Sequence, residues 1–560
     1  MTTSSSQPAR TVQISQGMSV GRAAWLLSAM IALSRVIGFG RTVLTSHLYG
    51  QGAVSDAYYA AFNIPDTISI LIAGGALATG FVPVFTELVS QNKQAEAQRT
   101  FRAMWTLLAL SFGAITALLF ALTWTPIGQM IAVQQAKSEA DLYLYLLRVL
   151  LIAQFFFVVG GLFSGTLNAL RLFWYSALQP VVFNLGILVF GLVLPHISDL
   201  GIKSQAWGAL AGAIVGSILI QLPAVRRSGL SLRPLLDLRD VGVNRVLKSL
   251  LPIVFGLASG QVIALNLPRF FAGALPFGNL SALDNANRLM QVPLDLLASG
   301  PAIALFPTLA LLSTRNDVAE MRLQLSSGLR RTLTLIFVAA ALLMALRLPI
   351  VRLLLEHGKF RLEDTKITAV VLLCYGLCLP GLGAQQFLAR GFYALGDTKT
   401  PVIIGVGAMI AFCAFGLVFT YAIPLGAPGL AIAAAISVSL LSLAMGAALR
   451  AKLHGWDEKP NATRDTILKS LVAAVAVYFV AEQVSSQAFG LLSASHGYLP
   501  PSLSFAERSF VLVLGAVAGA ATFLLFSRVL DLPLRNPRAK QRIVPETVLG
   551  EALENTGDNK

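Results

Sequence analysis

Charged residues are scarce in this chain, and their scarcity argues against a soluble protein. Of the 560 residues, 12% are charged and 56% are hydrophobic, whereas soluble globular domains carry about 25% charged residues. The mean hydropathy is +0.72. Stretches of about 20 apolar residues are long enough to cross the hydrocarbon core of a bilayer as helices. The composition therefore predicts an all-α polytopic membrane protein.

Cysteine is also rare, which limits disulfide and metal chemistry. The three cysteines, Cys374, Cys378 and Cys413, all lie in apolar segments, where a disulfide framework is not expected. Cys374 and Cys378 are one helical turn apart, but neither has a histidine or an acidic residue beside it. We therefore predict buried packing for this pair and no metal site.

The sequence signatures of enzymes and of nucleotide-binding proteins are missing as well. No phosphate-binding glycine loop occurs. A membrane glycosyltransferase would need catalytic acids in its outer loops, yet the predicted outer connections at 273–282, 423–427 and 489–507 contain almost none. The net charge of +15 would suggest nucleic acid as the partner of a soluble protein, but membrane topology explains it here. The sequence predicts neither an enzyme nor a nucleic-acid-binding protein.

Apolar stretches predict about fourteen transmembrane helices, joined by connections too short to hold a soluble domain. Their approximate spans are 24–46, 57–90, 103–132, 142–168, 176–196, 205–225, 249–272, 283–313, 329–354, 367–394, 401–423, 427–449, 470–488 and 509–530. We expect a disordered cytoplasmic tail at 1–20, an N-terminal lobe of six helices at 21–225, a basic cytoplasmic linker at 226–248, a C-terminal lobe of six helices at 249–450, two further helices at 451–530 and a cytoplasmic tail at 531–560.

The distribution of lysine and arginine predicts the orientation in the membrane. If both termini are cytoplasmic, the tails and inner connections carry 29 of the 42 lysines and arginines, and the outer connections carry eight. This asymmetry follows the positive-inside rule. We therefore expect a multi-pass protein with both termini in the cytoplasm.

An internal repeat relates the two predicted lobes. Residues 56–65 and 284–293, offset by 228 positions, place an aspartate, a side-chain amide and a proline at the same three positions. A second match pairs residues 178–181 with 399–402, where a proline opens a new span after a polar connection. Repeats that face the same way imply a parallel duplication. Transporters built from such repeats bind substrate at the repeat interface, near the bilayer midplane.

Polar residues on the second copy of this repeat form a single stripe. Asp284, Arg288, Gln291 and Asp295 lie within about 60° of arc at 100° per residue. A charged side chain at the middle of the membrane costs about 2.5–3.5 kcal/mol, so a residue of this kind is expected to have a function. We therefore expect this stripe to face protein or water rather than lipid.

Arginines on other spans extend the candidate site. Arg35 and Arg41 lie about 120° apart on the first span. One alternative is simple neutralisation, with Arg41 paired to Asp56 and Asp284 to the arginine four residues later. That alternative leaves Arg35 and Arg269 unpaired. An arginine cluster in a cavity of low dielectric binds phosphate or pyrophosphate in bidentate fashion, so we expect a phosphate-bearing substrate with an apolar part.

Six short segments form a specific set. They are SRVIGFGR at 34–41, SDAYY at 55–59, FVPVF at 81–85, ANRLMQVP at 286–293, EHGKF at 356–360 and FYALGDTKTP at 392–401. With these segments the chain resembles the MurJ/MviN family of bacterial lipid II flippases, within the multidrug/oligosaccharidyl-lipid/polysaccharide exporter superfamily. The resemblance covers about residues 20–530, in order and with the expected number of spans.

This resemblance implies translocation of lipid II, an undecaprenyl-pyrophosphate-linked disaccharide peptide, to the outer face of the bacterial plasma (inner) membrane for peptidoglycan synthesis. It implies alternating access of a two-lobe cavity and a lipid-tail groove formed by the helices within 451–530. The implied partners are lipid II or a related polyprenyl-pyrophosphate saccharide, membrane lipids and the cell-wall synthesis machinery. No cofactor is expected, and the energy source, a coupling ion or the membrane potential, stays open.

The resemblance also assigns roles to individual positions. Arg35, Arg41 and Arg288 match arginines of the family and are expected to bind the diphosphate. The expected cavity or gating residues are Asp56, Asn63, Asp284, Asn287, Gln291 and Asp295, with Arg269 as a further candidate.

Several positions depart from the best-known family members. Thr42 stands where an aspartate often follows the second arginine. Ser69 and Ile70 replace an arginine pair, and Gly74 replaces a glutamate. Asn287 and Gln291 replace an aspartate and a glutamate, and Arg269 lacks the adjacent aspartate that is associated with a sodium site in some members. Acids and bases are lost in similar numbers, so we expect a net positive cavity. Two alternatives stay open: a flippase or exporter of another lipid-linked oligosaccharide on the same fold, and a non-transporting membrane scaffold.

Overall fold

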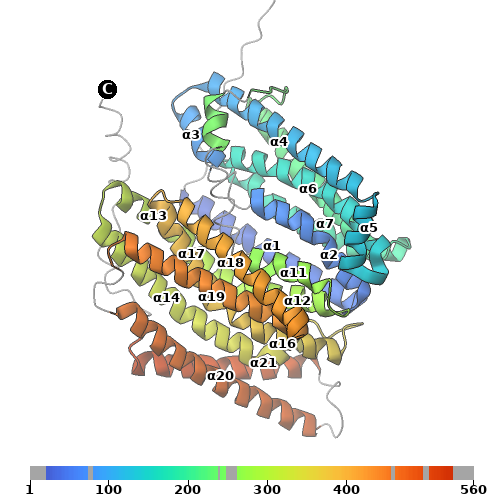
Figure 1. Ribbon diagram of the computed structural model, residues 1–560, viewed down its shortest axis with the longest axis vertical. Helices are drawn as coiled ribbons and strands as arrows, with labels where there is room; N and C mark the ends of the chain where they lie inside the picture. The colour runs from blue at the N-terminus through green and yellow to red at the C-terminus, as the bar shows by residue number, and fades with distance from the viewer. Residues whose placement is uncertain are drawn as a thin grey trace, which may run out of the picture.

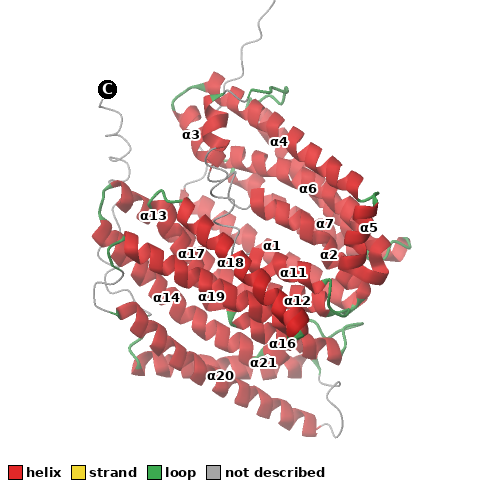
Figure 2. Ribbon diagram, viewed as in Figure 1, coloured by secondary structure: helices red, strands yellow, loops and turns green. Residues whose placement is uncertain are grey.

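A computed structural model describes residues 20–72, 80–237, 240–247, 262–455, 461–495 and 504–533 (Figure 1). Every regular element in these ranges is helical, as Figure 2 shows. The predicted all-α class is therefore confirmed.

Most of the N-terminal helices, coloured from blue to green, occupy the upper part of Figure 1, and α1 runs through its middle. They are α1 (Val20–Tyr49), α2 (Ala53–Ile72), α3 (Val82–Ser90), α4 (Gln94–Leu122), α5 (Pro126–Ala136), the 3₁₀ turn η2 (Lys137–Glu139), α6 (Ala140–Ala169), α7 (Phe173–Ile197) and α8 (Lys203–Ile214). A π-helical turn, η3 (Val215–Gln221), joins α8 to α9 (Leu222–Arg227).

The following helices, coloured from green to orange, lie across the middle of Figure 1. They are η4 (Val262–Asn266), α11 (Leu267–Ala272), α12 (Asn279–Leu294), η5 (Asp295–Ser299), α13 (Gly300–Thr314), α14 (Val318–Ala345), α15 (Arg347–Leu354), α16 (Leu362–Gly376), α17 (Cys378–Ala394), α18 (Lys399–Leu417), η6 (Val418–Ala422) and α19 (Gly426–Lys452). The last two helices, α20 (Ala462–Ser495) and α21 (Phe505–Val529), pair with each other beside α14 and α15.

The described helices account for most of the predicted membrane spans. Ten of them are long and apolar enough to cross a bilayer, or eleven if α16 and α17, bent by 42° at their junction, form one span. The predicted spans at 24–46, 57–90 and 249–272 are not among these, and the last two run through residues outside the described ranges. The count of fourteen therefore stays a prediction.

Glycines bring α7 and α8 into close contact. A Cβ atom added to Gly186 would lie 2.5 Å from the carbonyl oxygen of Gly208, and one added to Gly212 would lie 2.8 Å from the Cα of Phe183. Because the backbones leave no room for a side chain, these small residues set the helix spacing, as is common in membrane bundles.

The predicted basic linker packs against α4. Arg99 of α4 donates from Nε to Asp237 at 2.8 Å, and Arg102 donates to the carbonyl oxygen of Arg233 at 2.9 Å. Arg245, near the end of the described linker, pairs with Glu87 of α3 at 2.8 Å. The linker is therefore fixed to the N-terminal helices by several charged contacts.

Helices α2 and α12 face each other at the centre of the molecule. One apolar cluster extends from Tyr58 in α2 through Leu283 in α12 to Leu430 in α19, so the N-terminal and C-terminal helices share a core. Both α2 and α12 contain a proline, Pro65 and Pro293, which removes a backbone hydrogen bond. The π-helical turn η5 begins two residues after Pro293. Such irregular turns are frequent at functional sites, and the predicted polar stripe on α12 ends at Asp295, the first residue of this turn.

Candidate functional site

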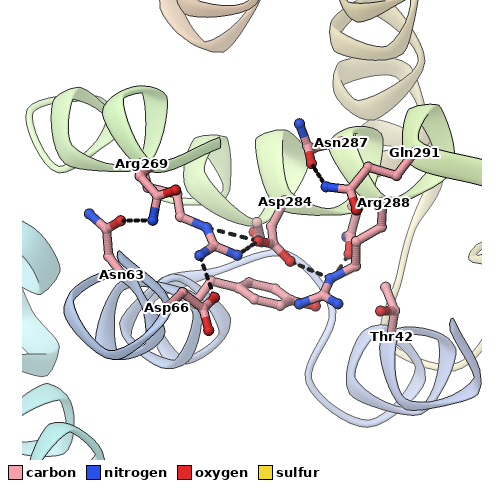
Figure 3. A network of polar contacts seen from close by, with 12 residues as sticks. Thr42, Asn63, Asp66, Arg269, Asp284, Asn287, Arg288 and Gln291 are labelled. Atoms are coloured by element: carbon pink, nitrogen blue, oxygen red, sulfur yellow. Dashed lines mark hydrogen bonds and ion pairs between the residues drawn. The ribbon is translucent and has the colours of Figure 1, made fainter. Parts of the chain in front are cut away.

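A buried carboxylate forms the centre of the polar network between α2, α11 and α12 (Figure 3). Asp284 of α12 has no exposed surface and accepts a hydrogen bond of 2.9 Å from Nε of Arg269. Its other oxygen accepts one of 2.6 Å from Nε of Arg288, one helical turn later. A carboxylate removed from water needs such partners because desolvation costs several kcal/mol per ion. The predicted Asp284–Arg288 pair is confirmed.

Arg269 is the most buried arginine of this network. Only 1% of its surface is exposed, and its Nη1 donates to Asp66 of α2 at 2.9 Å while its Nε and Nη2 contact Asp284. Its donors therefore bridge α2 and α12 through two carboxylates. The prediction that Arg269 is unpaired was wrong, because both of its partners come from other helices.

Arg35 of α1 reaches the far end of the stripe on α12. Its Nη2 lies 2.7 Å from a carboxylate oxygen of Asp295, and its Nη1 donates to Gln291 at 3.1 Å. Gln291 in turn donates to Asn287 at 2.7 Å. The prediction of an unpaired Arg35 was also wrong. This pair remains accessible, with 55% of the Arg35 side chain exposed.

Arg41 differs from the other arginines of the site. It is buried, its guanidinium lies 5.5 Å from the ring centroid of Phe62, and it is within electrostatic range of Arg288 and Asp284. Within the described part of the chain, its guanidinium makes no hydrogen bond and no ion pair. Arg41 is thus a buried cation held by an aromatic ring rather than by a carboxylate.

Asp56 does not pair with Arg41, which corrects the neutralisation alternative. Its two oxygens instead accept hydrogen bonds from the backbone amides of Gly278 and Ser281, at 2.7 and 2.8 Å. Gly278 precedes α12 with a φ of +87° and has no side chain to cap the helix. Asp56 therefore caps α12 from the neighbouring helix α2, where the helix dipole favours a negative charge.

Asn63 takes part in a polar contact between α2 and η4. Nδ2 of Asn266 lies 3.3 Å from Oδ1 of Asn63 and 2.7 Å from the hydroxyl of Thr67. Tyr59, one turn before Asn63, donates to Asn285 of α12 at 3.2 Å. These amides and hydroxyls connect α2 to η4, which leads into α11, and to α12.

Two members of the network, Asp66 and Asn266, were not predicted. Asp66 follows Asn63 by three residues, so helical spacing alone could have placed it on the same face as Asn63. Asn266 lies three residues before Arg269, so the same helical spacing could have placed it on the face of Arg269.

The departures from the family pattern have structural counterparts. Thr42 donates to the carbonyl oxygen of Gly38 within α1 and lies at the Arg288 end of the network in Figure 3. Asn287 and Gln291 bond to each other, so neutral amides take the place of two acids. The side chains of Ser69 and Ile70 and the whole of Gly74 lie outside the described residues.

The ion pairs of the site do not use all of its charged groups. Four guanidiniums, those of Arg35, Arg41, Arg269 and Arg288, face three carboxylates, those of Asp66, Asp284 and Asp295. The fourth carboxylate, that of Asp56, binds backbone amides instead. Arg41 is the arginine without an ion-pair partner among the described residues. Within those residues, no group of three or more His, Cys, Asp or Glu side chains is placed to hold a metal ion.

Contacts between the N-terminal and C-terminal helices close the end of the molecule at which the α1–α2 turn lies. The amide of Lys359 donates to the carbonyl oxygen of His47 at 2.9 Å, and Gln51 donates to Thr368 of α16. A Cβ on Gly50 would lie 2.6 Å from the carbonyl oxygen of Lys359, so the two backbones touch. Together with the Asp56 cap, these contacts bring the α1–α2 turn against three later segments.

Comparisons with known proteins agree with this architecture. The family model described as lipid II flippase MurJ matches residues 45–499. The lipid II flippase MurJ of Burkholderia cenocepacia is 30% identical over 77% of this chain and 84% of its own length. The probable lipid II flippase MurJ of Haemophilus influenzae is 29% identical over 89% of this chain and 98% of its own length.

Solved structures show the same fold. A lipid II flippase MurJ in an inward closed conformation aligns with a TM-score of 0.72 at 22% identity, covering 90% of this chain and 98% of that one. An inward-facing multidrug resistance MATE family transporter of the MOP superfamily aligns with a TM-score of 0.62 at 18% identity, covering 79% and 97%. The family model covers most of the chain, and the chain therefore belongs to the MurJ family.

Proposed function

We propose that this protein is a lipid II flippase, which moves the undecaprenyl-pyrophosphate-linked peptidoglycan precursor from the inner to the outer face of the bacterial inner membrane. Family membership over residues 45–499 supports this assignment. The observation that carries it is the uncompensated positive charge of Arg41 beside an arginine-rich network on otherwise apolar helices. A diphosphate supplies the negative charge that this site lacks.

The geometry divides the arginines into two classes. Arg41 has free donors, Arg35 is in an accessible pair with Asp295, and Arg288 uses only its Nε on Asp284. A guanidinium has five N–H donors, so these three arginines can bind phosphate oxygens at little cost to the network. Arg269 is buried and already uses each of its three guanidinium nitrogens on a carboxylate, and we assign it to positioning α11, α2 and α12.

Alternating access requires the outer end to open. In this proposal the N-terminal and C-terminal helices act as two lobes, and the structure represents a state closed at the end where Asp56 caps α12. Outward opening must break this cap and the His47–Lys359 contact. We assign Asp56 a gating role for that reason.

The energy source in this proposal is the membrane potential, with no resident cofactor and no covalent chemistry. Outward movement of a substrate with negative phosphates is favoured by an inside-negative potential, by about 2.3 kcal/mol per charge per 100 mV. Both termini lie in the cytoplasm, and the cell-wall synthesis machinery takes up the product outside. Unchanged translocation after the potential is collapsed would contradict this energy source.

The proposal is tested by replacing Arg35, Arg41 and Arg288 with alanine in a strain that depends on this protein. We expect no growth, although the variant reaches the membrane in normal amounts. Normal growth would overturn the site. Lost growth with undiminished lipid II at the outer face, and with another lipid-linked saccharide retained inside, would shift the assignment to that substrate.

A further inference from the structure

A second arginine cluster lies far from the site described above, between α15, α20 and α21. It lines a cavity of about 200 Å³ whose charged residues are Arg347, Arg352, Arg508 and Glu482 and whose apolar walls include Phe489 and Val511. The three arginine side chains are 19%, 17% and 12% exposed. Nothing in the proposed transport cycle uses them.

The acids near this cavity are shared unevenly among the three arginines. Arg347 pairs with Glu482 at 3.0 Å, whereas Arg352 and Arg508 share Glu356 at the longer distances of 3.8 and 3.5 Å. Arg508 also donates to the carbonyl oxygens of Arg352 and Glu356. Arg352 therefore has only a distant, shared carboxylate in a pocket with partly apolar walls.

Arg352 is the arginine with unused hydrogen-bonding capacity. Its Nε is buried and makes no hydrogen bond, and its guanidinium is fixed 4.4 Å from the ring centroid of Phe489. A buried donor left unsatisfied costs about 1–3 kcal/mol. A ligand oxygen that accepts from this Nε would remove that cost.

The position of the cavity indicates the class of ligand. It lies where α15 ends, α20 approaches its last turns and α21 begins, which is the end that the lysine and arginine distribution assigns to the outer membrane surface. Neighbouring residues of α20 and α21, including Phe479, Phe510 and Val513, expose large apolar side chains. A ligand here meets cations at its head and an apolar helix surface along its tail.

We propose that Arg352, with Arg347 and Arg508, binds the phosphate group of a lipid in the outer leaflet. Arginine forks bind phosphate in bidentate fashion, and the apolar walls favour a phosphate that carries hydrocarbon chains over a free one. The phosphate belongs either to a resident anionic phospholipid or to a polyprenyl diphosphate. This site does not depend on the proposed function of the central arginines.

The test compares Arg352→Gln with two matched variants in purified, delipidated full-length protein. Arg528→Gln changes an exposed arginine at the opposite end of α21. Arg352→Lys keeps the charge but loses the planar fork. Unfolding temperature without added lipid reports folding, and native mass spectrometry measures binding of phosphatidylglycerol, phosphatidylcholine, undecaprenyl diphosphate and inorganic phosphate.

We expect one tightly bound anionic lipid in the parent protein and in Arg528→Gln. Loss of a charge-assisted hydrogen bond lowers affinity about tenfold or more in Arg352→Gln, with a smaller loss in Arg352→Lys. Tighter binding of phosphatidylglycerol than of phosphatidylcholine identifies a resident phospholipid, and binding of undecaprenyl diphosphate alone identifies a polyprenyl lipid. Equal lipid binding in Arg352→Gln, or equal affinity for inorganic phosphate, overturns the proposal.

Discussion

The carboxylate of Asp56 accepts a hydrogen bond of 2.8 Å from the backbone amide of Ser281. One residue is near the start of α2 and the other is in the first turn of α12, so a helix is capped by a side chain more than 200 positions away in the sequence. The cap stabilises α12 and, at the same time, ties it to α2. In the proposed transport cycle, the same carboxylate acts as a gate at the outer end.

Asp56→Ala is expected to increase opening at the outer end. Loss of a helix cap costs about 0.5–2 kcal/mol, which shifts the balance between closed and open states by a factor of about 2 to 30. The measurement is labelling of a cysteine introduced at Gln51 by a membrane-impermeant maleimide, with Cys374, Cys378 and Cys413 replaced. Asp56→Asn keeps an acceptor oxygen and should label less. Equal labelling of all three proteins would contradict the gating role.

Asp284→Asn is expected to destabilise the fold strongly. The substitution leaves Arg269 with Asp66 as its one remaining acid and Arg288 beside a neutral amide. Breaking a buried ion pair by removing one partner costs about 3–5 kcal/mol. The check is a large fall in unfolding temperature in detergent. The double variant Asp284→Leu with Arg269→Met removes both charges and should regain part of the loss. A double variant no more stable than Asp284→Asn would count against this explanation.

Arg41→Ala is expected to abolish translocation without loss of folding. Arg41 has no ion-pair partner among the described residues, so its removal leaves no carboxylate uncompensated. We expect translocation to fall at least about tenfold, because a charge-assisted hydrogen bond contributes about 1.5–3 kcal/mol. The unfolding temperature should stay near that of the parent. Arg464→Ala, at an exposed position of α20, is the control. A translocation rate for Arg41→Ala equal to that of this control would remove Arg41 from the site.

The connection between α17 and α18 should make stability depend on acid pH. Burial alone would raise the pKa of Asp397, but Lys452 at 2.6 Å and the amide of Thr400 at 3.0 Å lower the pKa to about 2. A lowered pKa stabilises the folded state above the ordinary pKa of about 3.9. This stabilisation is lost as the pH falls from about 4 to 2. The unfolding temperature of Asp397→Asn should therefore fall less over this interval than that of the parent protein, and identical profiles would argue against the ion pair.

Local spacing was enough to predict part of the site. The i,i+4 relation of Asp284 and Arg288 predicted their ion pair, and the periodicity of α12 predicted a single polar stripe. The predicted burial of Cys374 and Cys378 was also correct, although the two cysteines lie in successive helices, α16 and α17. For the stripe on α12, one helix contains the whole relation.

Relations between helices could not be read from the sequence. Arg269 meets Asp66 only because α11 crosses α2, and Arg35 meets Asp295 only because α1 lies against the end of α12. Asp56 was assigned to Arg41 since both are charged and close in sequence. Its real partners are backbone amides, which every residue except proline carries and which therefore leave no sequence signal.

The central claim is that this protein moves lipid II across the membrane through the site that contains Arg41. The most direct measurement is the amount of lipid II exposed at the outer face after the protein is depleted from cells that have no other flippase. Exposure should fall on depletion and should be restored by the parent protein but not by Arg41→Ala. Undiminished exposure after depletion would contradict the account.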